Sequence, residues 1–273
     1  MNNYGWGLPI RASSFAGQID FGILLIHAAM ALIFVLWGVF FAYLLVRYRR
    51  RAGTPAQREE HHASSQGGFW ANNAGELKSL MPDVLVMLFE IALIVFYAFP
   101  VWRSIKMSPP DPKDADVVVE VTAEQFAWDV RYPGPDGKFG RAKPELVHFS
   151  NPLGLDRTDP AAADDIFVAN ELHLPVGKKT LIRLRSKDVV HDFFVPEFRL
   201  KQDAVPGLEI PMWVVPTRIG HYELACAQLC GFGHSLMRGD VYVESPEDFQ
   251  KWLASRAALK PAPPSAANNS GGF

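Results

Sequence analysis

The sequence has few cysteines and no excess of charge of either sign. Only two of its 273 residues are cysteines, which excludes a disulfide-rich scaffold and a zinc or iron–sulfur site built from four thiolates of this chain alone. Lysine and arginine together number 27 against 29 acids, so the strongly basic face of a nucleic-acid-binding protein is also missing. Hydrophobic residues make up 49% of the chain, which excludes disorder of the chain as a whole.

Charged residues are also absent from one long apolar run at residues 21–46. At about 1.5 Å per residue a helix of this length reaches roughly 39 Å, more than the ~30 Å hydrocarbon core of a bilayer. A second apolar run, residues 84–102, contains one acid, Glu90. We therefore predict transmembrane helices over residues 21–46 and 81–103. A buried core helix is the alternative for each run, and Glu90 favours that alternative more for the second.

Basic residues are unevenly distributed around these runs. Arg11 is the only basic residue in the N-terminal segment, residues 1–20. The segment after the first run contains a group of basic residues: Arg47, Arg49, Arg50, Arg51, Arg58 and Lys78. The positive-inside rule places residues 47–80 in the cytoplasm and both termini outside it. The N-terminus lacks the basic and apolar regions of a cleaved signal peptide, and it is not a transit peptide. We therefore expect a multi-pass protein of a bacterial inner membrane.

The second half of the chain has the composition of a β domain. After a linker rich in proline and aspartate at residues 104–115, short β-rich segments alternate with turn residues over 116–245, which favours an antiparallel sandwich or barrel. Residues 133–164 are rich in proline, glycine and aspartate and are expected to form a long loop. A short C-terminal helix is predicted over 246–260, followed by a disordered tail at 261–273.

Both cysteines lie in one short stretch, residues 226–237 (CAQLCGFGHSLM), together with His234 and Met237. Thiolate, imidazole and thioether form a soft ligand set, which suits copper better than calcium, magnesium or a structural zinc ion. Upstream, His191 follows a β-rich segment. A strand end and a loop between strands can together build a metal site at the rim of a β-sandwich.

The number of ligands distinguishes a mononuclear from a binuclear site. Two histidines, one cysteine and a weak axial methionine are the ligands of a mononuclear blue copper site, and the second thiolate is one too many for it. Two thiolates can bridge two metal ions, which leaves His191 and His234 as one terminal ligand each. Met237 and a main-chain carbonyl between the cysteines would then be weak axial donors. The count predicts a binuclear copper centre.

Three other interpretations of these residues stay open. Cys226 and Cys230 can form a disulfide in an extracytoplasmic domain. Met237 can be an ordinary core residue, and His191 a hydrogen-bonded structural histidine. A disulfide leaves the spacing of His234 and Met237 unexplained, and the five residues taken together favour the ligand interpretation.

Four motifs resemble those of subunit II of the haem–copper respiratory oxidases: AEQFAWDVRYPG at 123–134, SKDVVHDFFVP at 186–196, KQDAVPG at 201–207 and CAQLCGFGHSLMRG at 226–239. The resemblance covers roughly residues 15–258. It implies two N-terminal transmembrane helices followed by an all-β cupredoxin domain, a Greek-key β-sandwich or barrel. It also implies a binuclear copper centre, CuA, whose ligands would be the side chains of His191, Cys226, Cys230, His234 and Met237 and the main-chain carbonyl of Gln228.

The resemblance further implies a role in respiration. In this family the copper centre accepts electrons from a cytochrome c and passes them to haem in subunit I, where oxygen is reduced and protons are pumped. The chain would be an oxidoreductase subunit whose partners are subunits I and III, a cytochrome c or other haem c donor, and membrane lipid, with no nucleic acid. The alternatives are the CuA subunit of a nitric oxide reductase and a metal-free structural subunit of a quinol oxidase. The presence of all five side-chain ligands argues against the metal-free alternative.

The chain departs from the family pattern at several positions. Gln228 replaces a glutamate that usually helps to hold a magnesium or manganese ion against subunit I, which puts that ion in doubt. Phe126 replaces the usual tryptophan of electron input, so Phe126 and Trp128 are both candidates for that role. Leu208 replaces a common arginine. The chain has no Cys-x-x-Cys-His, so the donor haem is expected on a separate protein.

Acidic residues raise two further questions. In the family an acid near the cytoplasmic end of the second span can open a proton-uptake path, and which of Glu76, Asp83 and Glu90 contributes is left open. Asp188 and Asp192 flank His191, where they could help to dock a basic cytochrome or be ordinary solvated acids.

Overall fold

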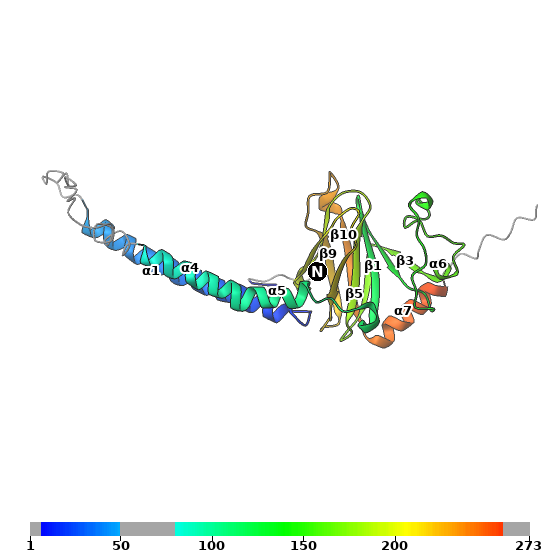
Figure 1. Ribbon diagram of the computed structural model, residues 1–273, viewed down its shortest axis with the longest axis horizontal. Helices are drawn as coiled ribbons and strands as arrows, with labels where there is room; N and C mark the ends of the chain where they lie inside the picture. The colour runs from blue at the N-terminus through cyan, green and yellow to red at the C-terminus, as the bar shows by residue number, and fades with distance from the viewer. Residues whose placement is uncertain (1–6, 50–79, 259–273) are drawn as a thin grey trace, which may run out of the picture. The chain divides into compact units, whose positions relative to one another are not determined.

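The computed structural model describes residues 7–49 and 80–258, which fall into two compact units (Figure 1). One unit is helical and comprises residues 18–104, and the other combines residues 1–17 with residues 105–273. Most of the predicted cytoplasmic loop at 47–80, including Glu76, and the predicted disordered tail at 261–273 lie outside the described residues.

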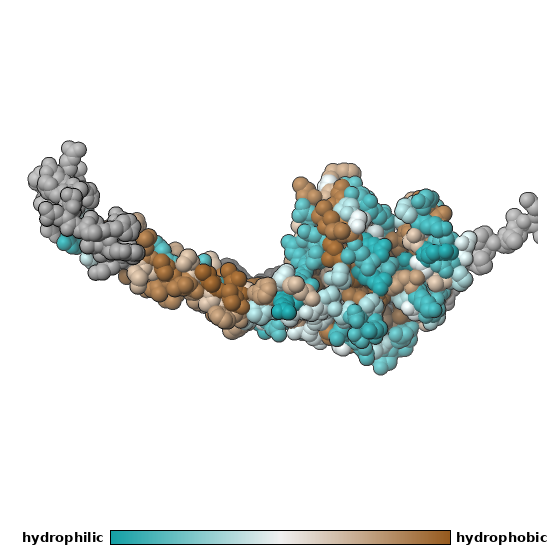
Figure 2. Space-filling model, viewed as in Figure 1, coloured by the Kyte–Doolittle hydropathy of each residue, from teal (hydrophilic) through white to brown (hydrophobic). Residues whose placement is uncertain are grey.

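The helical unit consists of two long apolar helical segments. The first is α1, Ala16–Arg47; the second runs through α4, Met81–Leu93, a π-helical turn η1, Ile94–Ala98, and α5, Phe99–Lys106. Both segments are long and apolar enough to cross a membrane, and neither is buried, unlike the core helix of a water-soluble protein. Figure 2 shows their exposed apolar side chains, a surface that needs lipid or protein to cover it. These helices indicate membrane anchoring.

The second unit is a β-sandwich. The described residues contain ten strands in two five-stranded sheets, ordered β3-β2-β1-β5-β8 and β4-β10-β9-β6-β7. Neighbouring strands are antiparallel except for the parallel pairs β1/β5 and β4/β10. The strands are β1, Val117–Glu124; β2, Ala127–Tyr132; β3, Ile166–Ala169; β4, Glu171–Pro175; β5, Thr180–Ser186; β6, His191–Val195; β7, Leu200–Ala204; β8, Ile210–Val214; β9, Gly220–Cys226; and β10, Arg238–Glu244. The predicted cupredoxin-like domain after two apolar helices is confirmed.

The core lies between the two sheets, where alternate side chains of each strand point inward. On β1 these are Val119, Val121 and Ala123, all fully buried. The predicted C-terminal helix is present as α7, Pro246–Ala258, and the hydroxyl of Ser245 accepts a hydrogen bond from the backbone N–H of Asp248 at its start.

The long loop between β2 and β3 is tied back to the sandwich by a buried arginine. It contains η3, Pro144–Leu146, and α6, Pro160–Asp164. Arg131 on β2 forms an ion pair with Glu120 on β1 at 3.1 Å and another with Asp165 at the end of the loop. These ion pairs attach the end of the loop to the sheet and offset part of the desolvation cost of burying the charged groups.

The N-terminal segment before α1 is part of the β unit, which the sequence does not predict. The backbone N–H of Ala12 donates to the carbonyl of Glu197 at 2.9 Å, and that of Thr217 donates to the carbonyl of Ala12 at 2.9 Å. Phe15 is only 4% exposed and packs edge-on against Trp213, with ring centroids 5.8 Å apart. We call residues 9–16 the N-terminal strap.

Candidate metal centre

The predicted ligands come from two neighbouring strands and the loop that follows one of them. His191 is the first residue of β6, and Cys226 is the last residue of β9. These strands pair so that Phe193 on β6 lies opposite Cys226 on β9, which brings His191 to the same end of the sheet as Cys226. The β9–β10 loop then carries the remaining predicted ligands: the carbonyl of Gln228 and the side chains of Cys230, His234 and Met237.

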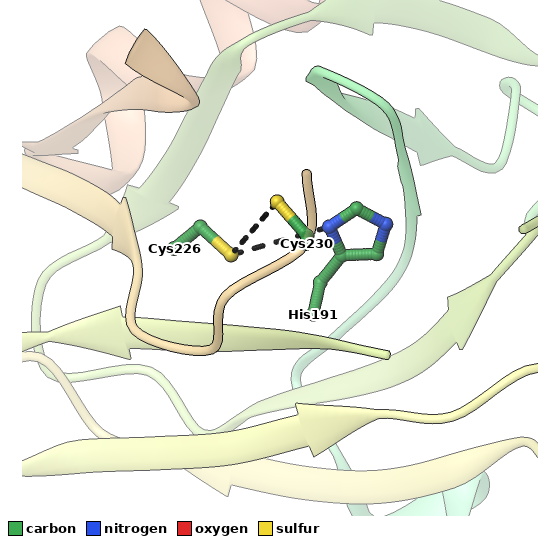
Figure 3. Close-up of side chains that lie close together, drawn as sticks. All are labelled: His191, Cys226 and Cys230. Carbon is green, nitrogen blue, oxygen red and sulfur yellow. Dashed lines mark hydrogen bonds between the residues drawn. The ribbon is translucent and has the colours of Figure 1, made fainter. Parts of the chain in front are cut away.

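Figure 3 shows three of these residues, His191, Cys226 and Cys230, with their donor atoms close together. The Sγ atoms of Cys226 and Cys230 are 3.8 Å apart. Nδ1 of His191 lies 4.0 Å from Sγ of Cys226, and Nδ1 of His234 lies 3.6 Å from Sγ of Cys230. Each thiol therefore has its own imidazole beside it.

The two predicted weak donors are divided in the same way. The carbonyl oxygen of Gln228 lies 3.2 Å from Sγ of Cys226. Sδ of Met237 lies 3.8 Å from Sγ of Cys230. The structure thus brings all six predicted donor groups into one cluster, in two sets of three.

The donor set fits copper by its chemistry. Sulfur and imidazole nitrogen dominate it, and the group formed by His191, Cys226 and Cys230 places all three ligand atoms within 4.8 Å of one another. Both cysteines are free, and their 3.8 Å separation is far longer than the roughly 2.05 Å of a disulfide bond. The geometry favours a metal site over the disulfide that the sequence left open.

Most of this cluster is shielded from water. His191, Cys230 and Met237 are buried, His234 is half-buried and Gln228 is exposed. In the metal-free chain, burial raises the pKa of the Cys230 thiol to about 11, and the adjacent Cys226 adds to this effect. A thiol binds metal as the thiolate, so metal binding would displace its proton.

One carboxylate fixes the orientation of the buried histidine. Oδ1 of Asp188 lies 2.8 Å from Nε2 of His191, which turns Nδ1 of the same ring toward Cys226. Carboxylates commonly orient metal-binding histidines in this way. Asp188 therefore acts within the site, and it is not simply a solvated acid.

The other acid beside His191 is not available for docking. Asp192 is only 5% exposed and pairs with Lys201 at 3.6 Å. Burial raises the pKa of its carboxyl to about 6. The suggestion that Asp192 presents a charge to a basic cytochrome is therefore wrong, because the side chain is buried and already paired with Lys201.

The two candidate aromatic residues differ in their exposure. Trp128 is 0% exposed and packs edge-on against His191 and Phe193, with ring centroids 6.3 and 5.7 Å away. Phe126 is half-buried and packs edge-on against Phe232, which is 100% exposed. Phe232 was not among the residues predicted for the site. Its position between two glycines and between predicted ligands could have indicated it.

Two of the predicted acids of the proton path can be located. Asp83 lies in the first turn of α4, and Glu90 lies later in the same helix with an exposed side chain. Glu76 is outside the described residues.

The sequence of this chain is similar to those of known oxidase subunits. Residues 117–244 match the family described as cytochrome c oxidase subunit II, periplasmic domain. The alternative cytochrome c oxidase subunit 2 of Bradyrhizobium diazoefficiens is 33% identical over 252 residues, which cover 91% of this chain and 83% of that protein. Cytochrome c oxidase subunit 2 of Cereibacter sphaeroides is 27% identical over 264 residues, which cover 91% and 79%.

A solved domain of an oxidase subunit II also matches part of this chain. The periplasmic domain of subunit II of cytochrome oxidase from Bradyrhizobium japonicum is 26% identical, with a TM-score of 0.41, and the match covers 55% of this chain and 98% of that one. The sequence relationship to the curated subunits spans the helices as well as the β domain. That extent of identity shows that this chain belongs to the cytochrome c oxidase subunit II family, and is thus a subunit of a haem–copper oxidoreductase complex.

Proposed function

We propose that the chain is the electron-input subunit of its oxidase and holds a binuclear copper centre, CuA. Electrons would arrive from a cytochrome c or another haem c donor and pass to haem in subunit I, where oxygen reduction is coupled to proton pumping. The observation that carries this proposal is the pairing of each thiol with its own imidazole nitrogen, at 4.0 Å for Cys226 and 3.6 Å for Cys230.

The residues that would hold the metal are the six predicted ones. The thiolates of Cys226 and Cys230 and the imidazoles of His191 and His234 would be the principal ligands of the two copper ions, and the thioether of Met237 and the carbonyl of Gln228 would be weaker donors. When bound, the two copper ions would supply a centre that takes up and releases one electron at a time. A mononuclear site of two imidazoles, one thiolate and the thioether would leave the second thiolate without a metal ion.

The chain's own residues hold the site rigidly and shield it from water. His191 is held by Asp188 at 2.8 Å and lies against Trp128, with no exposed surface. The strands on which His191 and Cys226 lie are paired within one sheet. A site held in this way changes shape little when its charge changes, which favours electron transfer.

Electron input is proposed at Phe126, with Trp128 behind it. Trp128 is fully buried against His191, so an approaching donor would meet Phe126 and the exposed Phe232 first. Leu229 and Leu236, on the same ligand loop, are also exposed. Exposed apolar residues around a functional site mark contact with other proteins, here the donor or the oxidase subunits I and III.

The membrane arrangement completes the proposal. The predicted spans, 21–46 and 81–103, would anchor the chain in a bacterial inner membrane. Residues 47–80 would lie in the cytoplasm, and the β domain and both termini outside it. With Gln228 in place of a glutamate, we do not include a magnesium or manganese ion against subunit I.

The order of reduction in the purified oxidase tests this role. After rapid mixing with reduced cytochrome c, the copper absorption should change before the haem of subunit I is reduced. An oxidase that carries Cys226→Ser should lose the early step, and its haem should be reduced much more slowly. If haem is reduced equally fast in the wild type and in the copper-depleted variant, electrons do not enter through this chain.

A further inference from the structure

The two-residue turn between β1 and β2 contacts both parts of the chain that carry the predicted ligands, although it supplies no ligand itself. We propose that this turn, Gln125 and Phe126, is a clamp that holds the predicted ligands in position before metal binds. The inference rests on the proposed copper centre. It assigns Gln125 and Phe126 as positioning residues, separately from any part that Phe126 has in electron input.

Gln125 forms hydrogen bonds toward both sides of the site. Its side-chain amide donates from Nε2 to the carbonyl oxygen of Cys230 at 2.6 Å. Its backbone N–H donates to Oδ2 of Asp188 at 2.7 Å, and the other oxygen of Asp188 holds Nε2 of His191 at 2.8 Å. One residue is therefore linked to the ligand loop directly and to His191 through a single carboxylate.

Phe126 covers the backbone of the ligand loop. A methyl group added at Gly233 would lie 2.5 Å from Cδ2 of Phe126, which is too close for any real contact. Gly233 itself has φ −89° and ψ 7°, a conformation open to other residues. The ring of Phe126, and not the backbone conformation, is therefore what requires glycine beside His234.

The start of the loop is attached to β6, where the backbone N–H of Ala227 donates to the carbonyl of Asp192 at 3.1 Å, and the bonds farther along the loop are local. The backbone N–H of His234 donates to Gly231 at 3.1 Å, and that of Leu236 donates to Gly233 at 2.9 Å. These bonds shape the loop without attaching its centre to the sandwich. The bond from Gln125 to Cys230 joins residues 105 positions apart and provides that attachment. Loss of partners that orient metal ligands typically lowers metal affinity by about 10- to 100-fold.

Copper release measures the clamp directly. The full-length chain, purified in detergent and loaded with copper, would be mixed with an excess of a copper chelator, and the rate of copper loss recorded with the electron paramagnetic resonance spectrum. Gln125→Met should bind the same amount of copper as the wild type but release it about 10-fold faster, with an altered spectrum. The matched control is Gln250→Met, on the exposed face of α7, which should release copper at the wild-type rate.

A double-mutant cycle separates the contact of Phe126 from a general effect on folding. Gly233→Ala should speed copper release in the wild-type background, because the new methyl group displaces Phe126. In the Phe126→Ala background the same substitution should add nothing, since the space is already free. This cycle does not involve Gln125, so it still tests the clamp if Gln125→Met fails to fold.

The clamp is contradicted if Gln125→Met releases copper within twofold of Gln250→Met with an unchanged spectrum. It is also contradicted if Gly233→Ala has the same effect with and without Phe126. These outcomes differ from a failure of the proposed function itself, in which the wild-type chain would bind no copper, or only one ion.

Discussion

At the residue scale, the two thiols of the cluster have different neighbours. Cys226 lies beside His191 and the Gln228 carbonyl, and Cys230 lies beside His234 and Met237. In a mononuclear copper site one thiolate would be sufficient. The division of the donors into two sets is what the binuclear interpretation requires, and it makes the two cysteines separately testable.

Replacing Cys226 with serine should remove one bridge and convert or abolish the binuclear centre. The expected result is at most one copper ion per chain, measured by metal analysis, and loss of the visible absorption of the wild-type copper chromophore. Ala227→Ser is a suitable control, because it places the same hydroxyl at the next, exposed position. An unchanged chromophore in Cys226→Ser would show that the bridging assignment is wrong.

The two aromatic residues should respond differently to substitution. Truncation of an aromatic contact residue commonly costs more than 1 kcal/mol of binding, so Phe126→Leu should raise KM for the haem donor by about tenfold. Trp128→Leu should slow electron input while copper content stays normal, because Trp128 packs against His191 and does not reach the surface. Steady-state kinetics with reduced cytochrome c distinguishes the two. A normal rate in Trp128→Leu would leave Phe126 as the route of input, and a normal KM in Phe126→Leu would exclude it as a contact.

At the scale of elements, the N-terminal strap completes one side of the β domain. The hydroxyl of Ser13 donates to the carbonyl of Phe198 at 2.7 Å, and Phe15 packs against Trp213 on β8. A fragment that begins near Pro112 therefore lacks an element of its own domain. Experiments on the isolated β domain would underestimate its stability for this reason.

The strap can be tested in the full-length chain. Phe15→Ala removes a buried ring and should lower the free energy of unfolding of the β domain by about 3 kcal/mol. Phe149→Ala, which removes a fully exposed ring on the β2–β3 loop, should change it very little. Denaturant unfolding followed by tryptophan fluorescence provides the comparison. Equal midpoints for the two variants would mean that the strap does not stabilise the domain.

The helix α7 packs on β4 and β10 through a group of stacked rings. His173 on β4 stacks against Trp252 of α7 and Tyr242 of β10, with ring centroids 3.8 and 4.7 Å away. Burial lowers the pKa of His173, and the nearby Glu244 and Glu171 oppose this only in part. His173 is therefore less protonated in the folded domain than in the unfolded chain when the pH falls below the ordinary histidine pKa of about 6.5.

Acidic pH should therefore lower the stability of the β domain through His173. The contribution of His173 to stability is fully present above about pH 6.5 and decreases as the pH falls toward its lowered folded-state pKa. Unfolding measured at pH 7.5 and 5.5 should show a smaller loss in His173→Gln than in the wild type. An identical pH dependence in His173→Gln and in the wild type would contradict this explanation.

The two apolar helices and the β domain could be predicted from the sequence, because both depend on local patterns. The spacing of Cys226, Cys230, His234 and Met237 also brings four candidate ligands together, at the end of β9 and on the loop that follows it. Their role as copper ligands stays a prediction. The parts that could not be predicted depend on contacts between distant residues. The strap joins Ala12 to Glu197, and the clamp joins Gln125 to Cys230. Asp192 was misjudged because its burial depends on residues of a neighbouring strand, such as Lys201 on β7, and not on its own place in the sequence.

At the scale of the whole molecule, the family assignment and the cluster support one account. The chain is an oxidase subunit with two apolar helices and a cupredoxin-like domain, and we propose that the domain collects electrons for a catalytic partner in the membrane. Oxygen chemistry would belong to that partner, so this chain's part is to bind copper and to hold the site steady. The central claim is therefore about the metal, and it can be tested without the rest of the complex.

The most direct measurement is the copper content of the full-length chain together with the electron paramagnetic resonance spectrum of its oxidised form. We expect two copper ions per chain that share one unpaired electron equally. One copper ion with a mononuclear spectrum would contradict this expectation, as would a copper-free protein in which Cys226 and Cys230 form a disulfide.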